Sequence, residues 1–268
     1  MTEKELMLTA LLDCERVDLY VDPPRLSPEQ GRKFSAMQDR RRNHEPLQYI
    51  VGECEFYGLR FKVDRRVLIP RPETEILVEK ILEMMAREAS FVKREAQLRI
   101  LDLGTGSGNI AVTLAKFLAG AAVMAVDISR DALDLAGENA RRHQVADRIR
   151  FVQADMLGFL MSSDASEGPF DIIASNPPDI KSKDMESLPP DVQQEPCVAL
   201  DGGDDGLRFY RTMISRAGRF LREGGHLIAE IGDGQRDAVA SLFEQSCFSS
   251  VDFILDYVKT PRISIAKK

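Results

Sequence analysis

The sequence predicts an α/β protein whose core is a mainly parallel sheet with helices on both faces. From Arg99 onward, short apolar segments alternate with segments that have the apolar spacing of helices. The last two apolar segments, 250–256 and 262–266, have no helix between them, which predicts an antiparallel edge strand. A glycine cluster follows the first predicted strand, at the end where open α/β sheets bind ligands.

Composition narrows the class of protein. The chain has 268 residues, 44% hydrophobic and 29% charged, with a net charge of −7, which argues against stable nucleic-acid binding. We find no apolar run of about 18 residues and no signal peptide, so we expect no membrane association. The four cysteines and three histidines are scattered, which predicts neither disulfides nor a metal site. A cytoplasmic monomer is the expectation.

The N-terminal region reads as a small helical domain over residues 1–48. Residues 5–12 have helical spacing, and Ser27 followed by Pro28 resembles an N-cap with proline in the first turn of a helix that runs to Arg42. Residues 49–67 carry glycines and aromatic side chains in a pattern typical of short strands joined by a turn. We therefore predict a β-hairpin linker over 49–71.

The remaining residues, 72–268, form the predicted catalytic domain. A helix begins near Arg71 and continues to about Met85. Alternating strands and helices follow it. Besides the two terminal strands, the predicted strands are 99–103, 122–126, 150–153, 170–175 and 226–231.

The glycine cluster lies between the strand 99–103 and a predicted helix. Its spacing is GxGxG, and Asn109 stands where the dinucleotide-binding fingerprint needs its third glycine. An acid directly upstream would repel a pyrophosphate but suits the cationic methionine part of S-adenosylmethionine. A simple structural turn is the alternative. The cofactor-binding candidates here are Asp102, Gly104, Thr105, Gly106 and Gly108.

Two further acids follow the next two strands. Asp127 ends the strand 122–126, where a carboxylate can accept both hydroxyls of a ribose. Asp155 follows the strand 150–153; alone it reads as a loop acid. The order of all these acids resembles class I methyltransferases, which implies that Asp155 contacts the adenine amino group. The expected cofactor is thus S-adenosylmethionine, which leaves as S-adenosylhomocysteine.

The motif Asn176-Pro177-Pro178-Asp179 follows the strand 170–175 and supplies the catalytic candidates. Consecutive prolines make a rigid loop without N–H donors, so its carbonyls stay free to accept. If the Asn176 oxygen and the Pro177 carbonyl accept both protons of a planar NH₂ group, its lone pair is aimed at the methyl group. Asn176 also borders the cofactor. The alternative is an ordinary strand-ending turn.

Segments on either side of this motif resemble the release factor glutamine methyltransferases, the HemK/PrmC family. The matching segments are 45–52, 56–58, 67–75, 195–196, 199–203, 205–207 and 210–211. The resemblance implies a class I methyltransferase (Rossmann-like) seven-stranded sheet, preceded by a helical domain that docks the partner. It implies methylation of the side-chain nitrogen (N5) of the glutamine in the Gly-Gly-Gln motif of bacterial peptide chain release factors. Asn176, Pro177, Arg71 and Thr74 would bind the substrate.

The chain departs from the family pattern at two places. Residues 5–20 match what is usually a later helix, so one or two opening helices are expected to be absent. Asp179 stands where the family has an aromatic ring, which packs on the flat amide. By analogy with base stacking, losing that face costs about 1–3 kcal/mol of positioning. We expect slower turnover with retained cofactor binding.

Two other functions share these features. A DNA or RNA amino-methyltransferase acting on adenine N6 uses the same tetrapeptide, but it predicts a basic recognition region, and the most basic run is only Arg40-Arg41-Arg42. A catalytically weak protein that binds cofactor and release factor without turnover is favoured by Asp179 alone.

Overall fold

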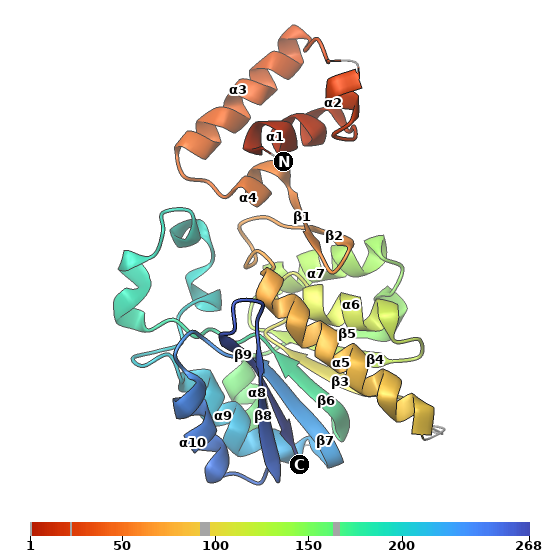
Figure 1. Ribbon diagram of the computed structural model, residues 1–268, viewed down its shortest axis with the longest axis vertical. Helices are drawn as coiled ribbons and strands as arrows, with labels where there is room; N and C mark the ends of the chain where they lie inside the picture. The colour runs from red at the N-terminus through yellow and green to blue at the C-terminus, as the bar shows by residue number, and fades with distance from the viewer. Residues whose placement is uncertain (1, 22, 92–96, 163–166) are drawn as a thin grey trace.

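The computed structural model describes residues 2–21, 23–91, 97–162 and 167–268. A group of helices at the N-terminus leads through a small hairpin into an α/β domain (Figure 1). The described helices include none that is long and apolar enough to cross a membrane.

The N-terminal helices are α1 (Glu3–Leu12), α2 (Asp18–Val21), α3 (Pro28–Arg42) and α4 (Leu47–Val51). The predicted N-cap of α3 is confirmed, because the Ser27 hydroxyl accepts the backbone N–H of Gln30 and the Gln30 side chain caps Ser27 in return. The prediction of strand from residue 49 was wrong for 49–51. Those residues continue α4, which ends at Gly52 in a left-handed conformation.

The hairpin itself is confirmed. It pairs β1 (Glu53–Phe56) with β2 (Leu59–Lys62) in antiparallel register. Tyr57 and Gly58 form its two-residue turn, with φ values of 51° and 71°. Positive φ at both positions matches the twist of the flanking strands.

The large sheet has seven strands in the order β5-β4-β3-β6-β7-β9-β8. Its strands are β3 (Arg99–Leu103), β4 (Ala122–Asp127), β5 (Ile149–Gln153), β6 (Phe170–Ser175), β7 (Leu221–Glu230), β8 (Ser250–Leu255) and β9 (Pro261–Lys267). The expected α/β fold with a seven-stranded sheet is therefore confirmed.

The antiparallel strand lies one place inside the edge. β9 runs antiparallel to both β7 and β8, so β8, which forms the edge, is parallel to β7. The helix α10 (Arg236–Glu244) joins β7 to β8 as a crossover, which makes those two strands parallel. After the short turn that follows Leu255, the chain returns as β9, which lies between β7 and β8.

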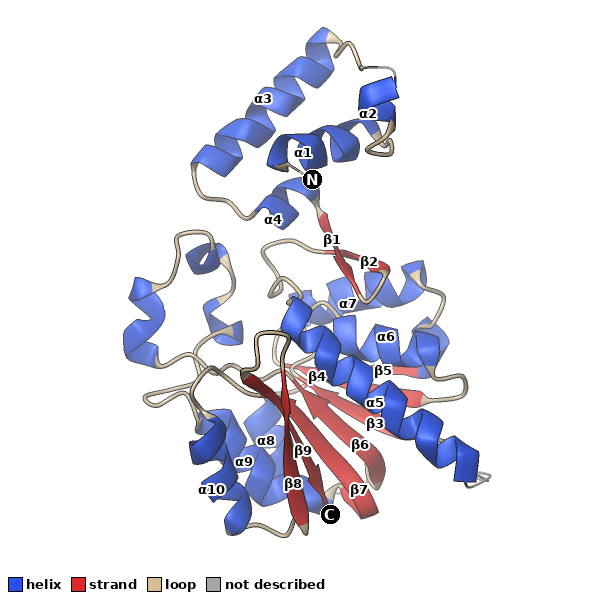
Figure 2. Cartoon of the chain, viewed as in Figure 1, coloured by secondary structure: helices blue, strands red, loops and turns tan. Residues whose placement is uncertain are grey.

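Helices cover both faces of this sheet (Figure 2). Alternate residues of each strand enter different cores: Ile100 belongs to one and Leu101 to the other. On one face lie α5 (Pro72–Phe91), α6 (Asn109–Phe117) and α7 (Arg130–Arg142), and on the other α8 (Met156–Met161), α9 (Arg208–Arg216) and α10.

The chain between β6 and α9 forms a long excursion over residues 176–207. It contains three short 3₁₀ helices, namely η2 (Ser182–Ser187), η3 (Val192–Gln194) and η4 (Cys197–Ala199). A bridge between Ile180 and Asp201 closes its base. Part of this segment was marked in the sequence by family resemblance alone.

Candidate active site

The predicted motifs meet at the carboxyl edge of the sheet. Leu103 of β3 lies opposite Ser175 of β6 and Val126 of β4, and the Ser175 hydroxyl donates to the Leu103 carbonyl at 2.7 Å. The glycine loop and Asn176 therefore start side by side. The strand order reverses between β3 and β6, which is where open α/β sheets bind ligands.

Two glycines of the loop have different surroundings. Both adopt positive φ, 52° at Gly106 and 79° at Gly108. A Cβ at Gly108 would lie 3.0 Å from the Cβ of Ala136, so that glycine lets α6 pack on α7. A Cβ at Gly106 would meet nothing within 4 Å. Gly106 is thus the position where the backbone is open to a ligand.

Asp102 lies beneath this loop and is fully buried. Its Oδ2 accepts the Thr105 hydroxyl at 2.6 Å and the Ala111 N–H at 3.2 Å. Its Oδ1 has no hydrogen-bond partner within the part of the chain that the structure describes. Burial raises the pKa of this carboxyl to about 7. A cationic ligand over the loop would stabilise its ionised form.

Asp127 extends from the end of β4 to the same loop. Its Oδ2 accepts the Gly106 N–H at 2.8 Å, and its Oδ1 accepts the Ser129 N–H at 2.9 Å. A carboxylate oxygen has a second lone pair, so both oxygens keep capacity to accept a hydroxyl. Burial raises the pKa of this carboxyl above its usual value.

Asp155 follows β5, but its carboxylate caps α8. Its oxygens accept the N–H groups of Leu157 at 3.3 Å and Gly158 at 3.1 Å. This exposed side chain therefore has a structural role that the sequence did not predict. Its contact with adenine stays a prediction.

The Asn176 side chain is held by residues from two other elements. Its Nδ2 donates to the Thr74 hydroxyl oxygen at 3.1 Å, and the Thr74 hydroxyl donates to Glu230 Oε2 at 2.6 Å. Thr74 is buried in the first turn of α5, and Glu230 is the last residue of β7. Pro177 and Pro178 are buried as well.

Sequence reasoning missed Glu230. It is a single acid in an otherwise apolar strand end, and only the pairing of Ser175 with Ala229 places it beside Asn176. The pKa of Glu230 is raised to about 7: burial is the largest cause, the bond from Thr74 acts against it, and the neighbouring Asp179 adds to the rise. An apolar strand that ends in a buried acid was the available signal.

Asp179 is partly buried at the same strand ends. Its carboxylate lies directly against Gly232, because a Cβ on that glycine would come within 2.3 Å of Asp179 Oδ2. Its backbone carbonyl accepts Gln235 Nε2 at 2.9 Å. Burial raises the pKa of the Asp179 carboxyl. The Asp179 side chain, at the position where the family resemblance implies an aromatic ring, thus lies against the backbone that follows β7.

Arg71 has a structural partner. Its guanidinium forms an ion pair with Glu195, whose other oxygen accepts the Ile69 N–H at 2.9 Å. The Glu195 side chain is only 2% exposed. This contact joins the linker to the excursion that follows β6. A substrate role for Arg71 stays a prediction, but the ion pair explains its position.

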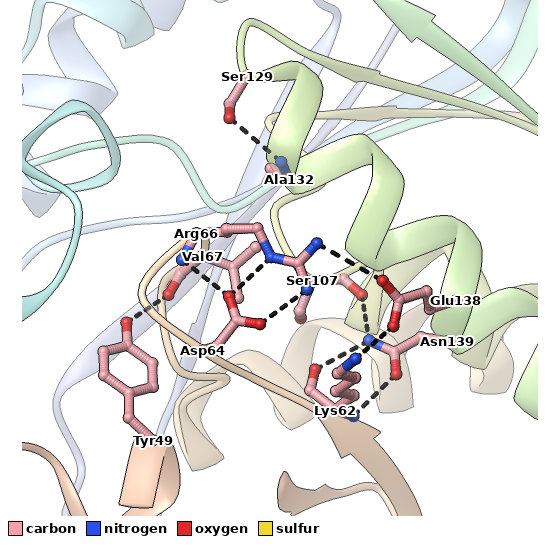
Figure 3. Close-up of polar contacts among 10 residues, drawn as sticks. All are labelled: Tyr49, Lys62, Asp64, Arg66, Val67, Ser107, Ser129, Ala132, Glu138 and Asn139. Carbon is pink, nitrogen blue, oxygen red and sulfur yellow. Dashed lines mark hydrogen bonds and ion pairs between the residues drawn. The ribbon is translucent and has the colours of Figure 1, made fainter. Parts of the chain in front are cut away.

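A second contact joins the linker to the glycine loop (Figure 3). The buried Asn139 of α7 accepts the Lys62 N–H at 2.8 Å and donates to the carbonyls of Lys62 at 3.0 Å and Ser107 at 2.9 Å. One amide therefore fixes the edge of the hairpin relative to the glycine loop. The role of Asn139 was not predicted from the sequence.

The basic run of α3 is neutralised by acids. Arg40 makes two bonds of 2.8 Å to Glu45. Arg41 pairs with Glu3, and Arg42 with Asp39. These pairs disfavour this run as a phosphate-binding patch. No group of three or more potential ligands for a metal ion occurs among the residues with described positions.

Comparisons with known proteins identify the family of this chain. The model of the PrmC N-terminal domain matches residues 2–52, and that of a methyltransferase domain matches 94–253. The release factor glutamine methyltransferase of Chlorobaculum tepidum is 43% identical over 260 residues, covering 96% of this chain and 87% of that protein. Its counterpart from Thermodesulfovibrio yellowstonii is 37% identical over 267 residues, covering 99% and 92%.

A solved structure supports the fold alone. The hMettl16 catalytic domain has a TM-score of 0.61 and 16% identity, covering 92% of this chain and 94% of that one. With relatives more than 30% identical along most of both chains, and with the motifs placed at one edge of the sheet, this chain belongs to the release factor glutamine methyltransferase family.

Proposed function

We propose that this chain transfers a methyl group from S-adenosylmethionine to the side-chain nitrogen (N5) of the glutamine in the Gly-Gly-Gln motif of bacterial peptide chain release factors. The observation that carries the proposal is the position of Asn176. It directly follows β6, and β6 pairs with the strand that leads into the glycine loop. Family membership supplies the class of substrate.

The residues around the glycine loop fit this cofactor. Asp102 Oδ1 is a buried carboxylate oxygen without a partner in the described chain, and it offers negative charge to a cation. Gly106 leaves the backbone open, and Asp127 keeps lone pairs for hydroxyl groups. When bound, the cofactor supplies an electrophilic methyl group on a sulfonium.

The chain's own contribution is orientation and charge stabilisation. The Asn176 amide oxygen and the Pro177 carbonyl accept the two N–H groups of the substrate amide, which directs the nitrogen lone pair away from its own carbonyl. A nitrogen–carbon bond forms as the sulfur–carbon bond breaks. The nitrogen then carries positive charge and releases a proton to water, so no strong base is required.

The proposed division of the chain assigns partner docking to residues 1–48, a hairpin linker to 49–71 and catalysis to 72–268. The match of the PrmC N-terminal domain over residues 2–52 supports the first assignment. The linker packs on α7 and is joined through Asn139 to the glycine loop. These contacts support a fixed position of the linker relative to the catalytic domain. We propose a monomer that acts in the cytoplasm, where release factors are found.

The test uses the purified chain, S-adenosylmethionine and a purified bacterial release factor, followed by peptide mass mapping. We expect a gain of one methyl group on the Gly-Gly-Gln peptide and none with Asn176→Ala. DNA and RNA substrates run in parallel. Methyl transfer to nucleic acid alone would refute the proposal. Cofactor binding by calorimetry with no methylated product would instead support a binding protein without turnover.

A further inference from the structure

Three residues from distant parts of the sequence converge on one amide group. Asn176 follows β6, Thr74 lies in the first turn of α5, and Glu230 ends β7. Nδ2 of Asn176 is 3.1 Å from Thr74 Oγ1, which is 2.6 Å from Glu230 Oε2. They form a continuous hydrogen-bond chain with a definite direction.

The carboxylate sets this direction. An ionised carboxylate only accepts hydrogen bonds, so the Thr74 hydroxyl gives its single proton to Glu230. The hydroxyl oxygen is then left to accept from Asn176, and only the amide nitrogen can donate. With Nδ2 held in this way, Oδ1 is the atom left for another partner.

We propose that Thr74 and Glu230 are positioning residues that orient the Asn176 amide so that its oxygen faces the methyl-acceptor nitrogen. The inference rests on the proposed function, in which that oxygen accepts an N–H of the substrate glutamine. The two ends of an asparagine amide have nearly the same shape, so packing alone distinguishes them poorly. If the Asn176 amide were reversed, its NH₂ group would face the N–H of the substrate glutamine. The hydrogen bond that orients the lone pair of the substrate nitrogen would then be lost.

Protonation of Glu230 removes this control. A protonated carboxyl donates to Thr74, whose hydroxyl can then donate to Asn176 Oδ1 and reverse the chain. The pKa of Glu230 is raised to about 7 as the net result of burial, which raises it most, of Thr74 and Arg262, which lower it, and of Asp179 and Glu73, which raise it. The Tyr210 hydroxyl faces the same strand end, but it donates to the Glu230 backbone carbonyl at 2.8 Å.

The kinetic test compares Thr74→Val, Thr74→Ser and Glu230→Gln with the unmodified chain on release factor. Thr74→Val has the same shape without a hydroxyl, and we expect kcat to fall about tenfold or more, as loss of one orienting bond implies. The KM for S-adenosylmethionine and its calorimetric affinity stay unchanged, which also shows that the variant folds. Thr74→Ser keeps the hydroxyl and restores kcat.

The pH profile separates positioning from packing. In the unmodified chain kcat falls as the pH drops through about 7, because Glu230 becomes protonated. Glu230→Gln has lower kcat and lacks this acid limb. Unchanged kcat in Thr74→Val, equal loss in Thr74→Ser, or an acid limb that survives in Glu230→Gln would each overturn the inference.

A measurement on the free protein separates this inference from the proposed function. The side-chain NH₂ resonances of Asn176, assigned by their loss in Asn176→Ala, should shift with a midpoint near pH 7. The shift should vanish in Thr74→Val and Glu230→Gln. Resonances that do not move in the unmodified protein overturn the positioning chain. A clear titration in a protein that methylates no release factor overturns the proposed function alone.

Discussion

Two glycines of the same loop should respond to alanine in opposite ways. Gly106 and Gly108 both have positive φ, 52° and 79°. An alanine in this region costs about 1–2 kcal/mol at either position, because its Cβ crowds the following carbonyl oxygen. This shared cost makes each variant a control for the other.

The difference comes from what each new methyl group meets. At Gly108 it lies 3.0 Å from the Cβ and 3.3 Å from the Cα of Ala136, and neither atom can move away without shifting α7. Overpacking adds about 1–3 kcal/mol, so the free energy of unfolding falls by about 2–5 kcal/mol in Gly108→Ala. At Gly106 nothing lies within 4 Å, so only the conformational cost remains.

Affinity for the cofactor should fall more in Gly106→Ala than in Gly108→Ala, which is the reverse of the order expected for stability. The methyl group of Gly106→Ala enters the space above the loop, and we expect affinity for S-adenosylhomocysteine to fall about tenfold or more, or roughly 1.4 kcal/mol. Folded Gly108→Ala should bind within a few fold of the unmodified chain. Urea unfolding measures the first quantity and titration calorimetry the second. Unchanged affinity in Gly106→Ala, or equal stability of both variants, would refute this reading of the loop.

Three further predictions use the same assays. Affinity for S-adenosylmethionine should rise as the pH increases through about 7, because Asp102 ionises there, and Asp102→Asn should abolish this dependence. Asp179→Tyr should increase kcat on release factor with unchanged cofactor affinity; no gain would show that the ring is not what this site lacks. Asn139→Ala should lower the free energy of unfolding by about 2–4 kcal/mol, because buried backbone groups lose their partners. Glu138→Ala, which removes surface ion pairs with Lys62 and Arg66, should cost under about 1 kcal/mol, and equal losses would contradict the role of Asn139.

The strands could be predicted because their apolar runs are short and end in recognisable loops. β3 and β6 have the predicted bounds. β7 begins at Leu221 instead of residue 226, because Gly224 and Gly225 look like a turn in sequence but continue the strand past a register shift. The last two segments pair antiparallel at one edge, as predicted, but their apolar pattern does not show that β9 lies inside β8, because strand order depends on the crossover helix α10.

The candidate site was predictable only where it follows strand ends. Asn176 and Asp127 occupy the same edge because parallel strands bring their carboxyl ends together. Glu230 was missed since its neighbour in the sheet depends on strand order. Arg71 pairs with Glu195, a partner that is not visible without tertiary structure, whereas Asp155 caps the helix that begins at the next residue, a local role that its N-cap position could have indicated.

The departure at Asp179 has two consequences that the structure separates. Relative to the aromatic that the family resemblance implies, it removes a ring from the proposed substrate site, and it adds a carboxyl that raises the pKa of Glu230. A gain in kcat in Asp179→Tyr therefore has two sources. The ring stacks on the substrate amide, and Glu230, which orients Asn176, ionises more easily. Asp179→Asn removes the charge without supplying a ring, so it should move the acid limb of kcat to lower pH and leave the plateau unchanged. The plateau reached by Asp179→Tyr above that of Asp179→Asn then measures the ring alone.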